Sequence, residues 1–161
     1  MRWRTKLKDS DPEAIRELVA ATGFFTAEEI EIAAELATET LQRGDAAGYL
    51  FTIVEDASGM AGYACFGRIP LTESSYDLYW IAVHPDHQGT GLGRRIIAKA
   101  EVAAIAAGAT LMFVDTAGRE QYRPTRAFYE GVGYHVEARL QDFYAPGDDK
   151  VIYARRLEPG T

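Results

Sequence analysis

A glycine-rich stretch in the middle of the chain constrains its fold more than any other feature. The apolar, β-prone run 80–83 precedes the turn 84–87, in which a proline removes a backbone donor and stops a strand. Glycines follow at positions 89, 91 and 93, and apolar residues then recur at helical spacing from Leu92 to Ala104. The unpaired N–H groups of a first helical turn, together with the positive end of the helix dipole, attract anions. The stretch therefore predicts a site for a phosphate or pyrophosphate, where glycines let the backbone approach the ligand.

The spacing of these glycines excludes two common kinds of phosphate site. A dinucleotide fingerprint needs Gly-x-Gly-x-x-Gly, but Arg94 follows the third glycine, and the Gly-Lys-Ser/Thr of a P-loop is absent. The chain instead has Gln88-x-x-Gly91-x-Gly93 directly after the strand. On these positions alone, a simple turn before a helix explains the pattern equally well. The rest of the chain has to distinguish the two interpretations.

Length and composition predict one domain spanning residues 1–161. The net charge of −7 argues against non-specific binding to nucleic acid, and no apolar run reaches the length of a membrane span. The single cysteine, Cys65, rules out an internal disulfide, and the first residues lack the apolar run of a signal peptide. We therefore expect a cytoplasmic protein without nucleic-acid or membrane partners.

Hydrophobic periodicity predicts a chain of alternating helices and strands. The expected helices cover about residues 10–23, 26–44, 92–107 and 124–130, and the expected strands 3–8, 49–55, 60–69, 75–83, 109–116, 134–143 and 150–157. Capping boxes are expected at Ser10–Glu13 and Thr26–Glu29. Because a helix joins strands 75–83 and 109–116, these two should run parallel. The order predicts an α/β (mixed α+β) fold, with an open, mostly antiparallel seven-stranded sheet and helices on both faces.

A second motif, TRAFYEGVGY, covers residues 125–134. It resembles the short helix of the GCN5-related N-acetyltransferases (the GNAT family), which usually ends Phe-Tyr-x-x-x-Gly-Phe, although here the last residue is Tyr134. The glycine loop resembles the coenzyme A pyrophosphate loop of the same family, and the element order is similar over the rest of the chain. The resemblance implies the acyl-CoA N-acyltransferase fold, in which the fourth and fifth strands are parallel and splayed apart.

The resemblance also implies an enzyme that transfers an acetyl group from acetyl-CoA to a primary amine. The amine would attack directly, with both substrates bound in one ternary complex. The acceptor stays open between a small-molecule amine and a protein or peptide amine, and a homodimer is left open too. A non-catalytic acyl-CoA-binding sensor or regulatory module is the alternative. Its only support is Tyr122, which stands where the family often has an asparagine.

The family pattern assigns a coenzyme site residue by residue. The glycine loop would wrap the pyrophosphate, strand residues 81 and 83 would hold the pantetheine arm, and the Val83 N–H would polarise the thioester carbonyl. The expected coenzyme-binding residues are Ile81, Ala82, Val83, Gln88, Gly89, Thr90, Gly91, Leu92, Gly93, Arg94, Tyr122 and Arg126. With Arg119 and Arg123, Arg126 forms either a basic rim for the 3′-phosphate or a solvated helix face.

Two residues are expected to move protons. Tyr129 matches the family's tyrosine, which sits by the thioester sulfur and protonates the departing thiolate; a plain core aromatic is the alternative. Asp77 is the candidate base, because family members with a known carboxylate base carry a glutamate at this position, eleven before Gln88. Aspartate is one carbon shorter, and an ordinary strand-end carboxylate is equally compatible with the sequence.

Phe24, Phe25 and Tyr79 are the candidate residues for binding the acceptor amine. The two phenylalanines lie in a loop between predicted helices, and binding residues concentrate in such loops. Strand alternation places Tyr79 on the same face as Asp77. The alternative is that all three pack in the core. The acidic net charge fits a cationic amine. No metal is expected, because the neighbouring histidines at 84 and 87 lie on a turn without a nearby cysteine.

Overall fold

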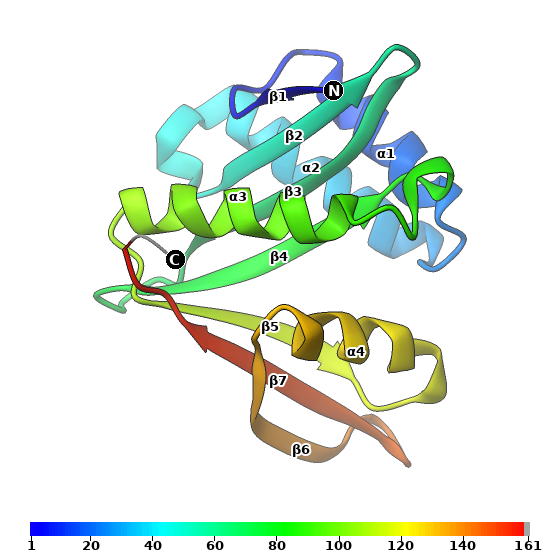
Figure 1. Ribbon diagram of the computed structural model, residues 1–161, viewed down its shortest axis with the longest axis vertical. Coiled ribbons are helices and arrows are strands. Elements are labelled where there is room, and N and C mark those ends of the chain that lie inside the picture. The colour runs from blue at the N-terminus through cyan, green and yellow to red at the C-terminus, as the bar shows by residue number, and fades with distance from the viewer. Residues whose placement is uncertain (160–161) are drawn as a thin grey trace.

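One sheet carries helices on both faces in the computed structural model, which describes residues 1–159 (Figure 1). The strands are β1 (Arg2–Arg4), β2 (Leu50–Asp56), β3 (Gly59–Arg68), β4 (Ser75–Val83), β5 (Leu111–Ala117), β6 (His135–Ala145) and β7 (Asp148–Arg156). The helices are α1 (Asp11–Ala21), α2 (Ala27–Arg43), α3 (Leu92–Ala106) and α4 (Arg123–Gly131). The sheet order is β1-β2-β3-β4-β5-β7-β6, and among the described strands only β4 and β5 pair in parallel. The predicted fold class is confirmed.

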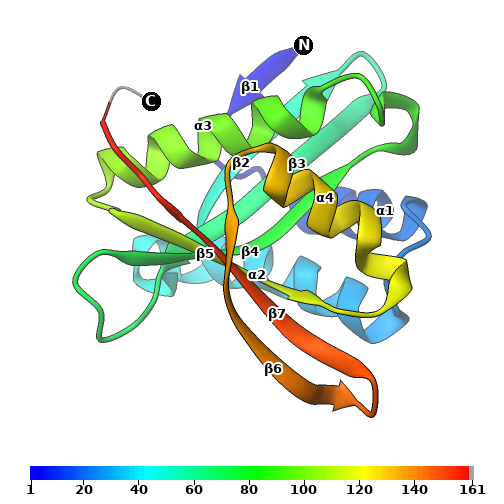
Figure 2. The same ribbon diagram turned by 60° about the horizontal axis from the view of Figure 1, so that its bottom comes forward.

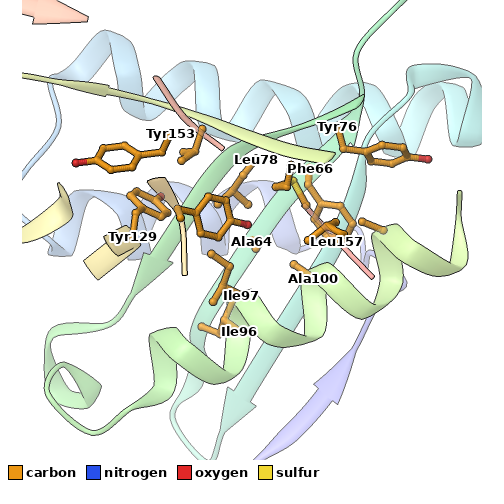
Figure 3. Packing of buried hydrophobic residues seen from close by; sticks show 14 of the residues in the cluster. Ala64, Phe66, Tyr76, Leu78, Ile96, Ile97, Ala100, Tyr129, Tyr153 and Leu157 are labelled. Atoms are coloured by element: carbon orange, nitrogen blue, oxygen red, sulfur yellow. The ribbon is translucent and has the colours of Figure 1, made fainter. Parts of the chain in front are cut away.

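The helices build two hydrophobic layers on this sheet. α1 and α2 cover one face of β2–β4, while α3 crosses the other face and α4 lies beside it over β5 and β7 (Figure 1 and Figure 2). The layer under α3 and α4 contains Ile96, Ile97 and Tyr129 (Figure 3). The layer under α1 and α2 contains Ile15 and Tyr63. Within residues 1–159, none of the helices is long and apolar enough to cross a membrane.

β4 changes its packing face at Tyr79. Trp80 lies opposite one residue of β3 and Leu78 lies opposite the next, so Tyr79 is the extra residue of a β-bulge. Before the bulge, Leu78 packs into the layer under α3. After it, Trp80 packs against the layer under α1 and α2. The simple alternation expected along this strand therefore breaks at Tyr79.

β4 and β5 separate just before this bulge. Their parallel ladder ends where Asp77 lies opposite Phe113, yet β4 continues to Val83 and β5 to Ala117. The ends of the two strands therefore leave backbone groups that no neighbouring strand pairs. The splayed pair expected from the family resemblance is present.

The start of the chain differs from the prediction. β1 ends at Arg4 instead of near Lys8, and Ser10 makes no side-chain hydrogen bond to the start of α1. Asp11 takes its place: its buried carboxylate accepts the Lys8 N–H and two hydrogen bonds of 2.7 Å from the Arg4 guanidinium. The capping box at Ser10–Glu13 is therefore wrong, because an ion pair from outside the helix fixes this turn.

The second capping box is confirmed. The Thr26 hydroxyl accepts the Glu29 N–H at 3.2 Å, and the Glu29 carboxylate accepts the Thr26 N–H at 2.9 Å. The turn between the last two strands is tighter than expected. β6 reaches Ala145 and β7 starts at Asp148, because Gly147, at φ +80°, allows a short turn between them.

Replacing Gly67 with alanine should lower the free energy of unfolding by about 2 kcal/mol. A Cβ at this position of β3 would lie 2.1 Å from the carbonyl oxygen of Gly48, and a backbone atom cannot rotate out of the way. Urea unfolding followed by circular dichroism measures the loss. Gly118→Ala is the matched control, because its Cβ would meet no atom closer than 3.4 Å. Equal stability of the two variants would contradict the prediction.

Candidate active site

A cavity of about 820 Å³ lies where β4 and β5 separate. Its walls come from the α1–α2 loop, the end of β4, the glycine loop, the first turn of α3, β5 and α4. The sequence-predicted residues that line it are Phe24, Phe25, Tyr79, Ile81, Ala82, Val83, Gln88, Gly89, Gly91, Leu92, Gly93, Arg94, Tyr122 and Tyr129. The fold thus places most of the candidate residues on one continuous surface.

The end of β4 presents unpaired backbone donors to this cavity. The N–H of His84 donates to the carbonyl of Ala61 on β3, at 2.8 Å. Because successive N–H groups of a strand point to opposite sides, the N–H of Val83 points away from β3. So does the N–H of Ile81, two residues earlier. Both face the gap that β5 has left, where an extended chain could pair with them.

The glycine loop forms the start of α3 on the next wall. Gly89 has φ +77° and Gly91, the N-cap of α3, has φ +86°, conformations that L side chains rarely adopt. Two side chains hold the loop in place. The Gln88 amide donates to the Val83 carbonyl at 3.3 Å, and His87 Nε2 bonds the Asp56 carboxylate at the β2–β3 turn. The first turn of α3 therefore opens into the cavity with free N–H groups and the positive end of its dipole.

Tyr129 lies deep in the cavity wall, on α4. Its side chain is 4% exposed and packs edge-on against Phe128 and Tyr134, with ring centroids 5.3 and 5.8 Å away. Its hydroxyl makes no hydrogen bond within residues 1–159. Burial, and to a smaller extent the nearby Tyr122, raises the pKa of the Tyr129 phenol well above its ordinary value. The phenol therefore keeps its proton at neutral pH and can donate it.

Asp77 does not line the cavity; it forms the last residue pair of the β4–β5 ladder, with Phe113, next to the lining residue Leu78. Burial raises the pKa of its carboxyl to about 6, with a further contribution from Asp115, while Lys150 acts in the opposite direction. Burial, and then Asp77 itself, raises the pKa of Tyr79 to about 12. Asp77 is thus a half-buried carboxylate that changes charge close to neutral pH.

The two phenylalanines of the α1–α2 loop have one side in the protein and one in the cavity. Phe25 packs against the layer under α1 and α2 and meets Trp80 edge-on at 5.0 Å. Phe24 meets Tyr122 in the same way at 4.9 Å. Tyr122, in the place of the family's usual asparagine, is therefore part of an aromatic wall.

Thr90 and Arg126 lie outside the lining of the cavity. The Thr90 hydroxyl donates to the carbonyl of His87, inside the glycine loop. The Arg126 guanidinium donates to the carbonyls of Ala117 and Arg119, at 2.7 and 3.0 Å, and so ties β5 to the start of α4. Within residues 1–159, no three His, Cys, Asp or Glu side chains cluster in a way that could hold a metal ion.

Glu29, Asp115 and Phe128 are among the lining residues that sequence reasoning missed. The capping box accounts for Glu29 in the sequence, so no pattern indicated that its side chain also lines the cavity. Asp115 is an aspartate within a strand, which reads as an ordinary solvent-facing residue until β5 is known to leave β4. Phe128 belongs to the quoted helix motif, and its proximity to Tyr129 was the available signal.

Comparisons with known proteins agree with this geometry. The model of the acetyltransferase (GNAT) domain matches residues 47–136. A crystal structure from Desulfovibrio desulfuricans, assigned to the GNAT family of acetyltransferases, is 44% identical, covers 98% of this chain and 99% of its own, and superposes with a TM-score of 0.96. None of the curated proteins matches the chain.

More distant solved structures share the fold. The aminoglycoside 6′-N-acetyltransferase of Enterococcus faecium is 15% identical, with 100% of this chain and 99% of that chain covered and a TM-score of 0.78. A Salmonella typhimurium protein, assigned as an acetyltransferase and solved with its cofactor acetyl-CoA, is 19% identical, with 100% and 97% covered and a TM-score of 0.72. At these identities the likeness concerns the fold alone.

Proposed function

Because the chain belongs to the GNAT family and is an acetyl-CoA-dependent N-acetyltransferase, we propose that it passes the acetyl group directly to a primary amine, with both substrates bound together. One observation carries the proposal. The glycine loop, the unpaired edge of β4 and the buried Tyr129 phenol all line the same cavity. The acceptor is a small-molecule or peptide amine, and the net charge of −7 favours a cationic one.

The glycine loop and α3 hold the pyrophosphate of the coenzyme in this proposal. The left-handed conformations of Gly89 and Gly91 turn successive backbone N–H groups toward one point, and the dipole of α3 adds positive potential there. Arg94 also lines this end of the cavity, while its guanidinium donates to the Gly131 carbonyl at 3.1 Å. This end of the cavity therefore suits an anion.

The edge of β4 supplies the donors that the thioester requires. The Ile81 N–H can pair with the pantetheine arm as a neighbouring strand would. The Val83 N–H, two residues closer to the loop, is positioned to donate to the thioester carbonyl oxygen as negative charge develops on it. A fixed donor of this kind lowers the barrier by roughly 3 kcal/mol.

Tyr129 completes the transfer by donating its proton to the leaving sulfur. The neutral amine nitrogen forms a bond to the carbonyl carbon, the C–S bond breaks, and the thiolate takes the phenolic proton. The attacking nitrogen gives up its own extra proton to a base. Holding both substrates in one cavity supplies much of the rate, because it removes the entropic cost of an encounter at the moment of reaction.

Asp77 is the base of this proposal, acting through water, since it lies just outside the cavity lining. Its carboxyl must be ionised to accept a proton, so its contribution appears above its pKa of about 6 and is lost below it. The residues that influence its charge are Asp115, Lys150 and Tyr79.

The plot of log kcat/KM against pH should lose a bend in the Asp77→Asn variant. The acceptor amine, with a pKa near 10.4, already makes log kcat/KM rise with pH. Ionisation of Asp77 adds a second unit of slope below about pH 6, which the asparagine variant lacks. At pH 7.5, kcat should fall about 10-fold, which is less than the roughly 100-fold or more typical of a general base in direct contact, because a water lies between. A bend that persists in the variant would mean that the base lies elsewhere.

Unfolding experiments on the same variant test the raised pKa independently of activity. The folded state holds the Asp77 proton more tightly than the unfolded chain, whose carboxyl has a pKa near 3.8. The wild-type protein should therefore gain stability relative to Asp77→Asn as the pH falls from 6 to 4. Urea titrations at both pH values measure this difference, and no change would contradict the burial of a charged Asp77.

Calorimetry combined with an amine screen tests the proposed function. Coenzyme A should bind with measurable heat, and acetyl-CoA with a suitable amine should release thiol steadily. Binding without thiol release from small amines, polyamines or peptides would favour a non-catalytic acyl-CoA-binding module. Absence of coenzyme binding would overturn both.

A further inference from the structure

An aromatic wall lines the cavity on the side of the α1–α2 loop. Its rings touch in sequence, Trp80 to Phe25 at 5.0 Å, Phe25 to Phe24 at 5.0 Å and Phe24 to Tyr122 at 4.9 Å. All four residues line the cavity and none is fully buried. The Gln121 side chain donates to the Phe24 carbonyl at 3.2 Å and so fixes the α1–α2 loop against the segment before α4. These contacts link the two segments that carry most of the wall.

Two carboxylates, Glu29 and Asp115, line the same cavity as this wall. The Arg119 guanidinium lies over the Tyr122 ring, 4.6 Å from its centroid, and pairs with Asp148 at 2.9 Å, while Arg94 lines the glycine-loop end. Burial raises the pKa of Tyr122, Arg119 acts in the opposite direction, and Glu29 adds a smaller upward effect. The Asp115 side chain is 52% exposed and forms an ion pair with Lys150 through Oδ2, at 3.3 Å. Its other carboxylate oxygen can accept a hydrogen bond from a further donor.

Rings and carboxylates together match one kind of acceptor. We infer that the acceptor is a primary amine carrying an aromatic ring, which packs its ring on Phe24 and Phe25 while Glu29 and Asp115 attract its ammonium group. The inference rests on the proposed transfer to an amine. Aromatic rings gain from edge-to-face contact beyond the apolar area they bury, and a cationic amine gains from the carboxylates. A polyhydroxylated amine would instead leave hydroxyl groups facing rings, without hydrogen-bond partners.

Binding of amines to the protein saturated with coenzyme A tests the inference without requiring turnover. We expect 2-phenylethylamine to bind at least about 30-fold more tightly than ethylamine, because only the former buries a ring. Spermidine and an aminoglycoside should bind more weakly than 2-phenylethylamine. Equal or tighter binding of ethylamine, spermidine or the aminoglycoside would overturn the inference. Tight binding of 2-phenylethylamine without thiol release from acetyl-CoA would instead overturn the proposed function.

Two substitutions separate the ring contact from the charge. Phe24→Ala should weaken 2-phenylethylamine binding about 10-fold and leave ethylamine within 2-fold. Glu29→Gln should weaken both amines several-fold at low salt, since a glutamine oxygen still accepts the Thr26 N–H and keeps the helix cap. Val102→Ala, at an exposed apolar residue of α3 outside the cavity lining, is the control and should change neither. Unchanged binding in Phe24→Ala would also overturn the inference.

Discussion

Replacing Tyr129 with phenylalanine should lower kcat about 300-fold while the Kd of coenzyme A changes less than 2-fold. The hydroxyl makes no hydrogen bond within residues 1–159, so its removal breaks no internal contact. The ring still fills its place between Phe128 and Tyr134. Because the pKa of the phenol is raised by burial, the wild-type residue is fully protonated throughout the neutral range and can serve as the acid. The variant leaves the thiolate to depart without a proton.

Steady-state kinetics and calorimetry on the same preparation measure the two quantities. Tyr153→Phe is a matched control, since Tyr153 is also buried, packs 6.1 Å from Tyr129 and does not line the cavity. It should leave kcat unchanged. A Tyr129→Phe variant with wild-type kcat would remove this residue from the mechanism and leave it as a core aromatic.

The parts of the fold that could be predicted are those with strong local signals. The long strand ends at Val83 as expected, because a proline follows closely, and α3 begins within the glycine loop. The Thr26 capping box is likewise contained in four residues. The Ser10 capping box has the same sequence pattern but does not form, because Arg4, seven residues earlier, pairs with Asp11 at the start of the helix. Local patterns could not show that competing ion pair.

The parts of the site formed by backbone groups, the glycine loop and the end of β4, could be predicted from the sequence. The parts formed by side chains from separate elements could be predicted much less well. The β-bulge at Tyr79 depends on how β3 pairs with β4, which no pattern within β4 reveals. The same applies to Asp115, which faces the cavity because β5 leaves β4 two residues earlier. The sequence placed Arg126 on its helix. It could not show that the guanidinium donates hydrogen bonds to the carbonyls of the segment before that helix.

The bulge and the splay explain why one sheet can serve both as core and as site. Up to Asp77, β4 pairs on both edges, which makes it rigid, and Tyr76 and Leu78 pack into the layer under α3. Beyond Tyr79 it keeps its pairing to β3 and loses its pairing to β5. The donors of Ile81 and Val83 are thereby freed on a strand that is still held from one side. Such a rigid edge can present fixed dipoles to a developing charge.

Coenzyme A should still bind when Gly91 is replaced by asparagine, and much more weakly when it is replaced by aspartate. Asparagine and aspartate both adopt left-handed conformations more readily than other residues, and a Cβ at Gly91 would meet no atom within 4 Å. The two variants thus carry the same backbone strain and differ by one charge. Two unit charges about 5 Å apart at an effective dielectric constant near 20 repel by roughly 3 kcal/mol. Coenzyme A should therefore bind Gly91→Asp about 100-fold more weakly than Gly91→Asn.

Calorimetry at two salt concentrations measures this difference, which should narrow as salt screens the added charge. Unfolding supplies the internal control. An aspartate at the N-cap of α3 interacts favourably with the helix dipole, so Gly91→Asp should be at least as stable as Gly91→Asn without coenzyme. Binding and stability then move in opposite directions, which a damaged fold cannot produce. Equal coenzyme affinity in the two variants would mean that the pyrophosphate binds away from the start of α3.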